Sequence, residues 1–333
     1  MSTPATSNDP AARLFAAREA LRSEMKKCVV GQEETAELLL LTLLCRGHAL
    51  LLGVPGVGKT LMSAALAKAL HLEFHRVQFT PDLMPGDITG TEVLEEDPST
   101  GRYQRIVMPG PLFANVLLAD EINRTPPKTQ AALLQAMQEG QVTIGRETYT
   151  LPSPFLVLAT QNPIEMEGTY PLPEAQLDRF FFCIRVNYPD QEDELAIAMN
   201  APGSALAAVN AVLDAEALKA LQESVQAVPI STDVGRYAVR LASATRPQTS
   251  NVPGVTEFIE CGASPRASQA LVLAGKARAL LNGRAHVDFA DIRALAPAVL
   301  RHRLVLNFRA RAEKVDADAI VAKLLQQVSQ EKA

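Results

Sequence analysis

Residues 53–60 place glycines, a lysine and a threonine at a spacing that suits phosphate binding: Gly53, four residues, then Gly58, Lys59 and Thr60. A triphosphate carries several charges on closely spaced oxygens, so the backbone N–H groups of a bent loop surround it better than side chains do. Gly56 and Gly58 permit the bend, Lys59 adds a positive charge, and the Thr60 hydroxyl suits Mg²⁺. We therefore expect a nucleoside triphosphate to contact the loop and the start of the next helix, at Pro55, Gly56, Val57, Gly58, Lys59, Thr60 and Leu61.

Two acidic residues follow an apolar run further along the chain. Residues 116–119 are apolar and lead directly into Asp120 and Glu121, about sixty positions after Lys59. Ligands of open α/β sheets bind at the carboxyl ends of the strands. We therefore expect Asp120 to hold Mg²⁺, directly or through water, and Glu121 to orient or deprotonate an attacking water. The alternative is a pair of solvated acids that cap the next helix.

Three further polar residues stand where they could act on a phosphate. Asn162 follows the apolar run 155–159, and its amide suits a hydrogen bond to the attacking water; the alternative is ordinary turn chemistry before Pro163. Arg179 suits an arginine finger, although an Asp–Arg surface pair would also explain it. Arg266 begins a helix after Ser264, where a cation opposes the helix dipole unless an anion is near; the alternative is a solvated arginine.

Composition excludes several classes of protein. The 333 residues carry a net charge of −5, which argues against a protein that coats nucleic acid. The four cysteines are widely spaced, as in a reducing compartment, and give no metal or disulfide pattern. The first ten residues do not resemble a signal peptide, and no apolar run is long enough to cross a membrane. We therefore expect a cytoplasmic protein without membrane insertion.

Patterning predicts an α/β half followed by a helical half. Apolar runs at 49–52, 116–119 and 155–159 alternate with helical patterns, which indicates a parallel sheet. Turn-rich segments at 91–107 and 142–151 predict hairpins. Beyond residue 188 the chain shows almost no strand signal, and helices are expected at about 191–200, 214–227, 232–245, 265–282, 289–303 and 316–330. We divide the chain into an N-terminal helix (1–30), a nucleotide-binding α/β domain (31–188) and a small all-α lid domain (189–333).

Five segments together resemble the MoxR family of AAA+ ATPases. They are Gly-Val-Pro-Gly-Val-Gly-Lys-Thr (53–60), Leu-Leu-Ala-Asp-Glu-Ile-Asn-Arg (117–124), Ala-Thr-Gln-Asn-Pro (159–163), Glu-Gly-Thr-Tyr-Pro-Leu-Pro-Glu-Ala-Gln-Leu-Asp-Arg-Phe (167–180) and Ser-Pro-Arg-Ala (264–267). The similarity extends from residue 30 to about residue 304, and the segment 167–180 is the most specific.

The resemblance implies a role for each matching residue. Lys59 and Thr60 match Walker A, and Asp120 and Glu121 match Walker B. Asn162 matches sensor 1, Arg179 a finger supplied to a neighbouring subunit, and Arg266 sensor 2. Gly31 and Gln32 resemble the family's contact on the adenine side. Arg124 is a rival to Arg179 for the trans-acting role.

The same resemblance implies an ATP- and Mg²⁺-dependent motor of chaperone type. ATP would sit between the α/β domain and the lid at a subunit boundary, with Arg266 contributed by the lid. The assembly would be a homo-oligomer, a hexameric ring. It would act with a partner carrying a von Willebrand factor A domain on a client protein complex, in maturation, remodelling or metal insertion. A nucleic-acid motor or loader and a nucleotide-controlled scaffold with negligible turnover are the alternatives.

Overall fold

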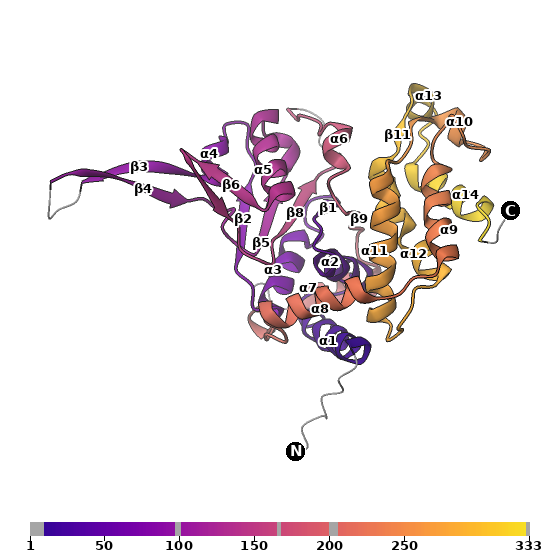
Figure 1. The fold of residues 1–333 in the computed structure, drawn as a ribbon, viewed down its shortest axis with the longest axis horizontal. Helices are drawn as coiled ribbons and strands as arrows, with labels where there is room; N and C mark the ends of the chain where they lie inside the picture. Colours follow the sequence, from indigo (N-terminus) through magenta and orange to yellow (C-terminus); the bar gives the residue numbers. More distant parts are fainter. Residues whose placement is uncertain (1–9, 97–100, 165–167, 200–205, 331–333) are drawn as a thin grey trace, which may run out of the picture.

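The computed structural model describes residues 10–96, 101–164, 168–199 and 206–330. Its centre is a five-stranded parallel sheet with strand order β2-β5-β8-β1-β9 (Figure 1). The strands are β1 (Ala49–Leu52), β2 (Phe74–Gln78), β5 (Val116–Asp120), β8 (Leu156–Gln161) and β9 (Phe182–Arg185). The expected α/β class is thereby confirmed. β9 was missed from the sequence, although the apolar run 180–184 was a signal for it.

Alternating residues of the central strands enter two different hydrophobic cores. Leu118 and Leu158 point to one face of the sheet, and their neighbours Leu117 and Val157 point to the other. This follows from the two-residue period of a strand. Because both faces are covered, β5 is buried along its whole length and reads as a continuous apolar run.

Helices cover the two faces. The helices α2 (Glu33–Leu44) and α3 (Lys59–Ala69) contribute to the core of the first face. The helices α4 (Pro85–Thr89) and α5 (Pro127–Glu139) supply Ile88, Leu133 and Leu134 to the core of the second. The short elements of this half are η1 (Ile122–Arg124) and α6 (Glu174–Leu177).

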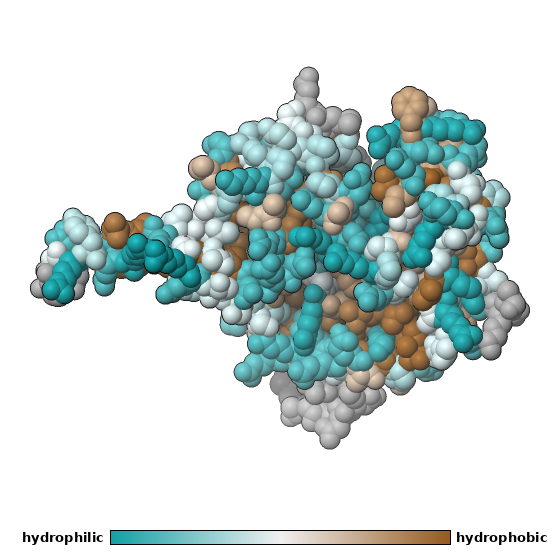
Figure 2. All heavy atoms as spheres, turned by 45° about the horizontal axis from the view of Figure 1, so that its top comes forward, coloured by the Kyte–Doolittle hydropathy of each residue, from teal (hydrophilic) through white to brown (hydrophobic). Residues whose placement is uncertain are grey.

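Two hairpins leave the sheet, as predicted. β3 (Gly90–Glu96) pairs with β4 (Tyr103–Pro109), and β6 (Gln141–Ile144) pairs with β7 (Glu147–Thr150). The predicted turn at 97–100 lies outside the described residues. The β3–β4 hairpin projects far from the body of the molecule (Figure 1). Figure 2 shows hydrophobic residues among hydrophilic ones on this projection, where Leu94 and Tyr103 are exposed.

The remainder is a helical lid, also as predicted. Its helical segments are α7 (Gln191–Met199), η2 (Leu206–Ala208), α8 (Ala215–Ala227), α9 (Thr232–Ser243), α10 (Val255–Phe258), α11 (Pro265–Leu281), α12 (Phe289–Leu300), η3 (Arg301–Arg303), α13 (Phe308–Ala312) and α14 (Ala317–Gln327). The expectation that the lid contains no strand is wrong, because β10 (Ile259–Cys261) pairs antiparallel with β11 (Val305–Leu306). These strands are too short to show a period in the sequence.

The first helix, α1 (Pro10–Met25), packs against α3 of the α/β half and against α11 of the lid. Leu14, Leu21 and Met25 are the buried residues that make this contact. Among the described residues, no helix combines the length and the apolar character needed to cross a membrane.

Candidate nucleotide-binding site

The loop between β1 and α3 forms an open cradle of backbone N–H groups. Gly56 and Gly58 have φ angles of 87° and 84°, in the left-handed region that favours glycine. A Cβ atom built on either residue would meet nothing within 4 Å, so no side chain packs against these two glycines. Gly58 caps α3 without a side-chain hydrogen bond, so the first N–H groups of the helix face this space. The Lys59 ammonium donates to the carbonyls of Gly53 and Val54 at the mouth of the cradle.

A cavity of about 180 Å³ adjoins the loop. Its walls are mainly apolar and come from the segment before α2, the loop, α3 and the start of the lid: Cys28, Val29, Val30, Gln32, Gly56, Val57, Gly58, Leu61, Met62, Pro189 and Ile197. Such walls suit a purine base. Gln32 is fixed here, because its amide donates to the Asn187 carbonyl at 2.8 Å and accepts from the Thr35 hydroxyl at 2.9 Å.

Gly31 lies next to this cavity with a φ of 71°. A Cβ at this position would lie 2.1 Å from an Asp193 carboxylate oxygen, so a larger residue would displace that side chain and strain the backbone. Pro55 is exposed at the tip of the loop. The described structure therefore places seven of the expected nucleotide-binding residues at the lining of one cavity or next to it, namely Gly31, Gln32, Gly56, Val57, Gly58, Lys59 and Leu61.

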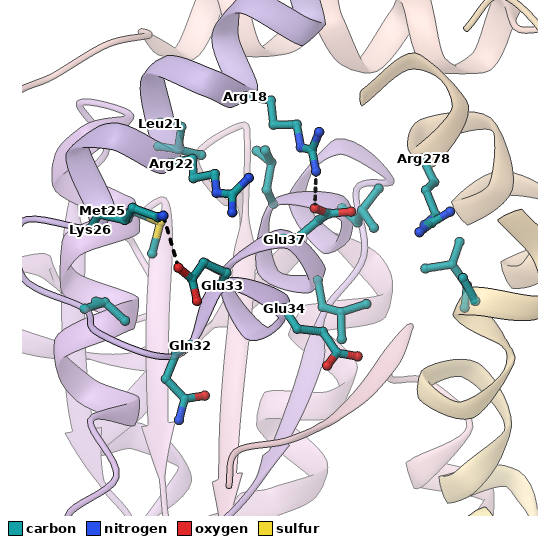
Figure 3. A pocket seen from close by; sticks show the side chains of 17 residues that line it. Arg18, Leu21, Arg22, Met25, Lys26, Gln32, Glu33, Glu34, Glu37 and Arg278 are labelled. Carbon is teal, nitrogen blue, oxygen red and sulfur yellow. Dashed lines mark hydrogen bonds and ion pairs between the residues drawn. The ribbon is translucent and has the colours of Figure 1, made fainter. Parts of the chain in front are cut away.

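A larger cavity of about 350 Å³ lies between α1, α2 and the lid and shares Val29 and Gln32 with the first (Figure 3). Two ion pairs lie on its rim: Arg18 bonds Glu37 at 2.5 Å, and Lys26 bonds Glu33 at 3.2 Å. No residue of the glycine loop lines it, so it is separate from the phosphate cradle.

Asp120, the last residue of β5, and Glu121, which follows it, are held by a network of side chains. Asp120 is buried and accepts from the Thr160 hydroxyl at 2.6 Å and from two nitrogens of Arg76 at 2.7 and 3.1 Å. Glu121 has a left-handed backbone, with a φ of 57°, directly after β5. Its carboxylate accepts from Gln78 at 2.7 Å and pairs with Arg124 at 3.1 Å.

Arg76 and Gln78 are site residues that the sequence analysis did not assign. Both lie on β2, two positions apart, and therefore on the same face of the strand. Gln78 is in register with Asp120, which brings the polar face of β2 against both acids. Polar residues at alternate positions of a strand beside the acidic strand were the signal for them.

Asn162 follows β8 at the same edge of the sheet. Its side chain is buried; the amide oxygen accepts from the Ile164 N–H at 3.3 Å. The amide nitrogen makes no hydrogen bond within the described part of the chain. A buried donor without a partner is costly, so this nitrogen is suited to a ligand that carries an acceptor oxygen.

The structure separates Arg179 and Arg266 from this edge. Arg179 precedes β9, whose first residue is in register with the first residue of β1, whereas the glycine loop follows the last residue of β1. Four strand residues span about 13 Å. The two arginines instead line a cavity of about 330 Å³ at the amino edge, together with His48 and Arg303. This cavity shares no lining residue with the cavity beside the loop.

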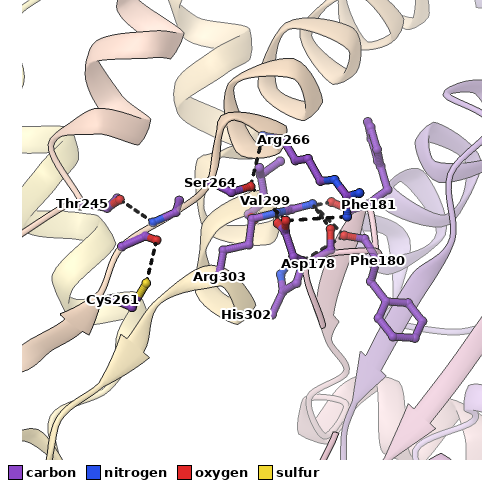
Figure 4. A network of polar contacts seen from close by, with 12 residues as sticks. Asp178, Phe180, Phe181, Thr245, Cys261, Ser264, Arg266, Val299, His302 and Arg303 are labelled. Carbon is purple, nitrogen blue, oxygen red and sulfur yellow. Dashed lines mark hydrogen bonds and ion pairs between the residues drawn. The ribbon is translucent and has the colours of Figure 1, made fainter. Parts of the chain in front are cut away.

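The expectation that Arg266 meets ATP bound to its own chain is therefore not supported by the geometry. Arg266 extends toward Asp178 and lies 3.9 Å from its carboxylate (Figure 4). Arg179 donates to the Leu134 carbonyl at 3.1 Å. Arg124, through its pair with Glu121, lies at the carboxyl edge instead.

His48 forms part of the wall of the arginine cavity and is uncharged. Burial lowers its pKa from 6.5 to about 4. Its Nε2–H donates to the Met137 carbonyl at 3.0 Å, and its Nδ1 accepts from the Val157 N–H at 3.0 Å. This neutral ring therefore connects β8 with the end of α5.

A glycine loop between the buried strand β1 and the helix α3, two acids at the end of β5, a buried amide after β8 and a helical lid together define a nucleoside triphosphatase of the AAA type. Comparison with known families agrees. Residues 48–182 match the model of the ATPase family associated with various cellular activities (AAA), and residues 254–324 match the AAA lid domain.

Individual relatives narrow the assignment. The chaperone MoxR1 of Mycobacterium tuberculosis is 45% identical over 307 residues, which cover 92% of this chain and 80% of that protein. The protein MoxR of Paracoccus denitrificans is 36% identical over 84% of this chain and 86% of its own length. A crystal structure of a protein from Cytophaga hutchinsonii superposes with a TM-score of 0.88 at 41% identity and covers 97% of both chains. This chain belongs to the MoxR-type AAA ATPases. Membership in this family implies ATP binding and hydrolysis, and it suggests oligomerisation.

Proposed function

We propose that the chain is a Mg²⁺-dependent ATPase motor that works as a ring of identical subunits and remodels client protein complexes. ATP binds with its phosphates on the loop at 53–60 and its base in the cavity beside Gln32. The loop supports this placement, because a Cβ built on Gly56 or Gly58 would meet nothing within 4 Å and because Gly58 leads directly into the N-terminus of α3.

The residues at the carboxyl edge fit a magnesium ion. The Thr60 hydroxyl and the Asp120 carboxylate are oxygen donors, which Mg²⁺ prefers, and most of its remaining ligands would be water and phosphate. When bound, the ion offsets negative charge on the phosphates. Asp120 is already oriented by Thr160 at 2.6 Å, so this carboxylate would not have to be ordered on binding.

Glu121 and Asn162 act on the attacking water. The carboxylate accepts the proton of the water, and the unpartnered Asn162 amide nitrogen donates to the water or to the γ-phosphate. Gln78 and Arg124 contact the Glu121 carboxylate and orient it at the carboxyl edge of the sheet.

The position of the two arginines is the observation that supports a ring of subunits with shared active sites. Arg179 and Arg266 lie together at the amino edge, about a strand length from the loop of their own chain. An arginine side chain cannot cross that distance. Both residues therefore act on ATP held by a neighbouring subunit whose carboxyl edge faces this cavity, and each active site is shared between two chains.

Mixing two inactive variants tests this arrangement. Lys59→Ala removes a cation that binds phosphate, and Arg179→Ala removes the finger. In a mixed ring, some interfaces combine the intact loop of the Arg179→Ala chain with the intact Arg179 of its neighbour, and ATPase activity should return. Arg266→Ala should behave in the same way, because it lies in the same cavity.

Arg124→Ala is the matched control. Arg124 contacts Glu121 within its own chain, so this variant should complement Arg179→Ala but not Lys59→Ala. Formation of mixed rings is checked by differently tagged subunits. Mixed rings that stay inactive with Arg179→Ala would contradict the shared site, and activity recovered with Arg124→Ala plus Lys59→Ala would move the finger to Arg124.

We further propose that hydrolysis remodels a client protein. The name of the M. tuberculosis relative, chaperone MoxR1, supports this reading. The family resemblance suggests a partner with a von Willebrand factor A domain and a hexameric ring. A Glu121→Gln variant that holds ATP should retain client and partner in an affinity capture. ATPase stimulation by DNA, with no such capture, would favour the nucleic-acid motor instead.

A further inference from the structure

The segment that carries Arg179 is held by the lid and not only by the sheet that follows it. Residues 178–181 connect α6 with β9, and within this segment the Phe181 N–H donates to the His48 carbonyl, next to β1, at 2.7 Å. Contacts from η3 and from the start of α11 surround this segment (Figure 4). The segment is therefore fixed by residues more than eighty positions away in the sequence.

Arg303 of η3 makes most of these contacts. Its side chain is only 3% exposed. The guanidinium donates to the Asp178 carboxylate at 2.8 Å, to the Phe180 carbonyl at 2.7 Å and to the Phe181 carbonyl at 3.3 Å, and also to the Val299 carbonyl. One planar group thus joins the end of α12 to three residues that flank Arg179.

The second carboxylate oxygen of Asp178 is bound from another part of the lid. The Ser264 hydroxyl donates to it at 2.9 Å and also accepts from the Arg266 N–H at 3.2 Å, so it caps α11. Asp178 therefore joins η3 to the N-terminus of α11. Because Arg266 is two residues from Ser264 and Arg179 is next to Asp178, one carboxylate connects the backbones of both arginines.

A purely structural role explains this cluster poorly. A buried ion pair contributes little net stability, since desolvation offsets most of the attraction, whereas apolar side chains of similar volume would stabilise the packing as well. The planar guanidinium of Arg303 instead fixes the orientation of its partners, because each N–H points at one acceptor. The acceptors it fixes are those that set the course of the backbone through Arg179.

We propose that Arg303 and Asp178 form a clamp through which the lid positions the trans-acting arginines. Arg303 is a positioning residue: it touches no substrate and acts by fixing the segment that carries Arg179. The inference rests on the proposed shared site. It adds that the lid holds Arg179 and Arg266 in one arrangement relative to the ATP of the neighbouring subunit.

Arg303→Lys tests the clamp, because lysine keeps the charge and loses the fork. A misplacement of about 1 Å at a catalytic group costs on the order of 10²-fold in rate, so kcat should fall roughly tenfold to a hundredfold. Affinity for a fluorescent ATP analogue should change less than about twofold, since the loop of the same chain is untouched. In mixing experiments Arg303→Lys should be rescued by Lys59→Ala, as expected for Arg179→Ala.

Arg284→Lys is the matched control. Arg284 pairs with the fully buried Asp291 inside the same lid, at 2.5 and 2.9 Å, far along the sequence from residue 178. This variant should lower the unfolding temperature and leave kcat unchanged. Ser264→Ala, which removes one bond to Asp178, gives a milder form of the clamp defect if Arg303→Lys does not fold.

The outcomes separate the two proposals. If Arg179→Ala is complemented but folded Arg303→Lys and Ser264→Ala both turn over at the normal rate, the shared site stands and the clamp is refuted. If Arg303→Lys loses activity but is not rescued by Lys59→Ala while Arg179→Ala is, the residue is structural and the clamp is also refuted. If Arg179→Ala itself is never complemented, the shared site is wrong, and the clamp falls with it.

Discussion

Acid should weaken this protein through His48, and the size of the effect follows from its environment. The ring is buried and neutral, with a folded-state pKa of about 4 against an ordinary value of 6.5. Well above pH 6.5 this histidine is neutral in both the folded and the unfolded state, so it does not make the free energy of unfolding depend on pH there. As the pH falls below 6.5, the unfolded state binds a proton that the folded state excludes, and the free energy of unfolding decreases until about pH 4.

The magnitude can be worked out from these values. Each tenfold difference in proton affinity is worth about 1.4 kcal/mol. The complete effect is therefore about 3 kcal/mol, and about 2 kcal/mol of it should be lost between pH 7.5 and pH 5. Both values are a substantial part of the stability of a typical domain.

The assay is urea unfolding at pH 7.5 and pH 5 for the unmodified chain and for His48→Gln. The unmodified chain should lose about 2 kcal/mol more than the variant over this interval. Burial lowers the pKa of His302 too, but that residue is present in both proteins and its effect cancels. His286→Gln, at an exposed position, serves as the control and should follow the unmodified chain. Equal losses in the unmodified chain and in His48→Gln would refute the argument.

Two further predictions concern the carboxyl edge. Glu121→Gln keeps the shape of the side chain and removes the base, so turnover should fall by about 10²–10⁴ while ATP affinity is unchanged. Normal turnover in a steady-state assay would show that Glu121 is not the base and only caps the turn that follows β5. Arg76→Met removes the cation that pairs with Asp120 at 2.7 Å, so it should lower the Mg²⁺ concentration needed for half-maximal nucleotide binding. The change should be at most about fivefold, because a half-exposed ion pair is worth up to about 1 kcal/mol. Exposed Arg105→Met, on the β3–β4 hairpin, is its control, and an identical Mg²⁺ titration for Arg76→Met would show that the pair does not compete with the metal.

The sequence determined the features that depend on neighbouring residues. The phosphate loop is a contiguous set of residues whose backbone freedom and charge are properties of the residues themselves. The two acids at the end of β5 and Asn162 after β8 were predicted because the ends of buried strands are visible in the chain and parallel strands bring their carboxyl ends to one edge. The same reasoning predicted the α/β class, the two hairpins and the helical lid.

Only the tertiary structure decided which edge each arginine occupies. Arg179 and Arg266 were matched to their roles by local motif, and a motif carries no information on distance across a sheet. The parallel direction of β1 and β9 places Arg179 at the edge opposite the loop, and the packing of α11 brings Arg266 to the same cavity. The partners of Asp120 and Asp178 were hidden for the same reason: Arg76 and Arg303 reach these carboxylates across 44 and 125 positions. Such contacts depend on how strands and helices pack, and packing is a property of the whole chain rather than of any segment of it.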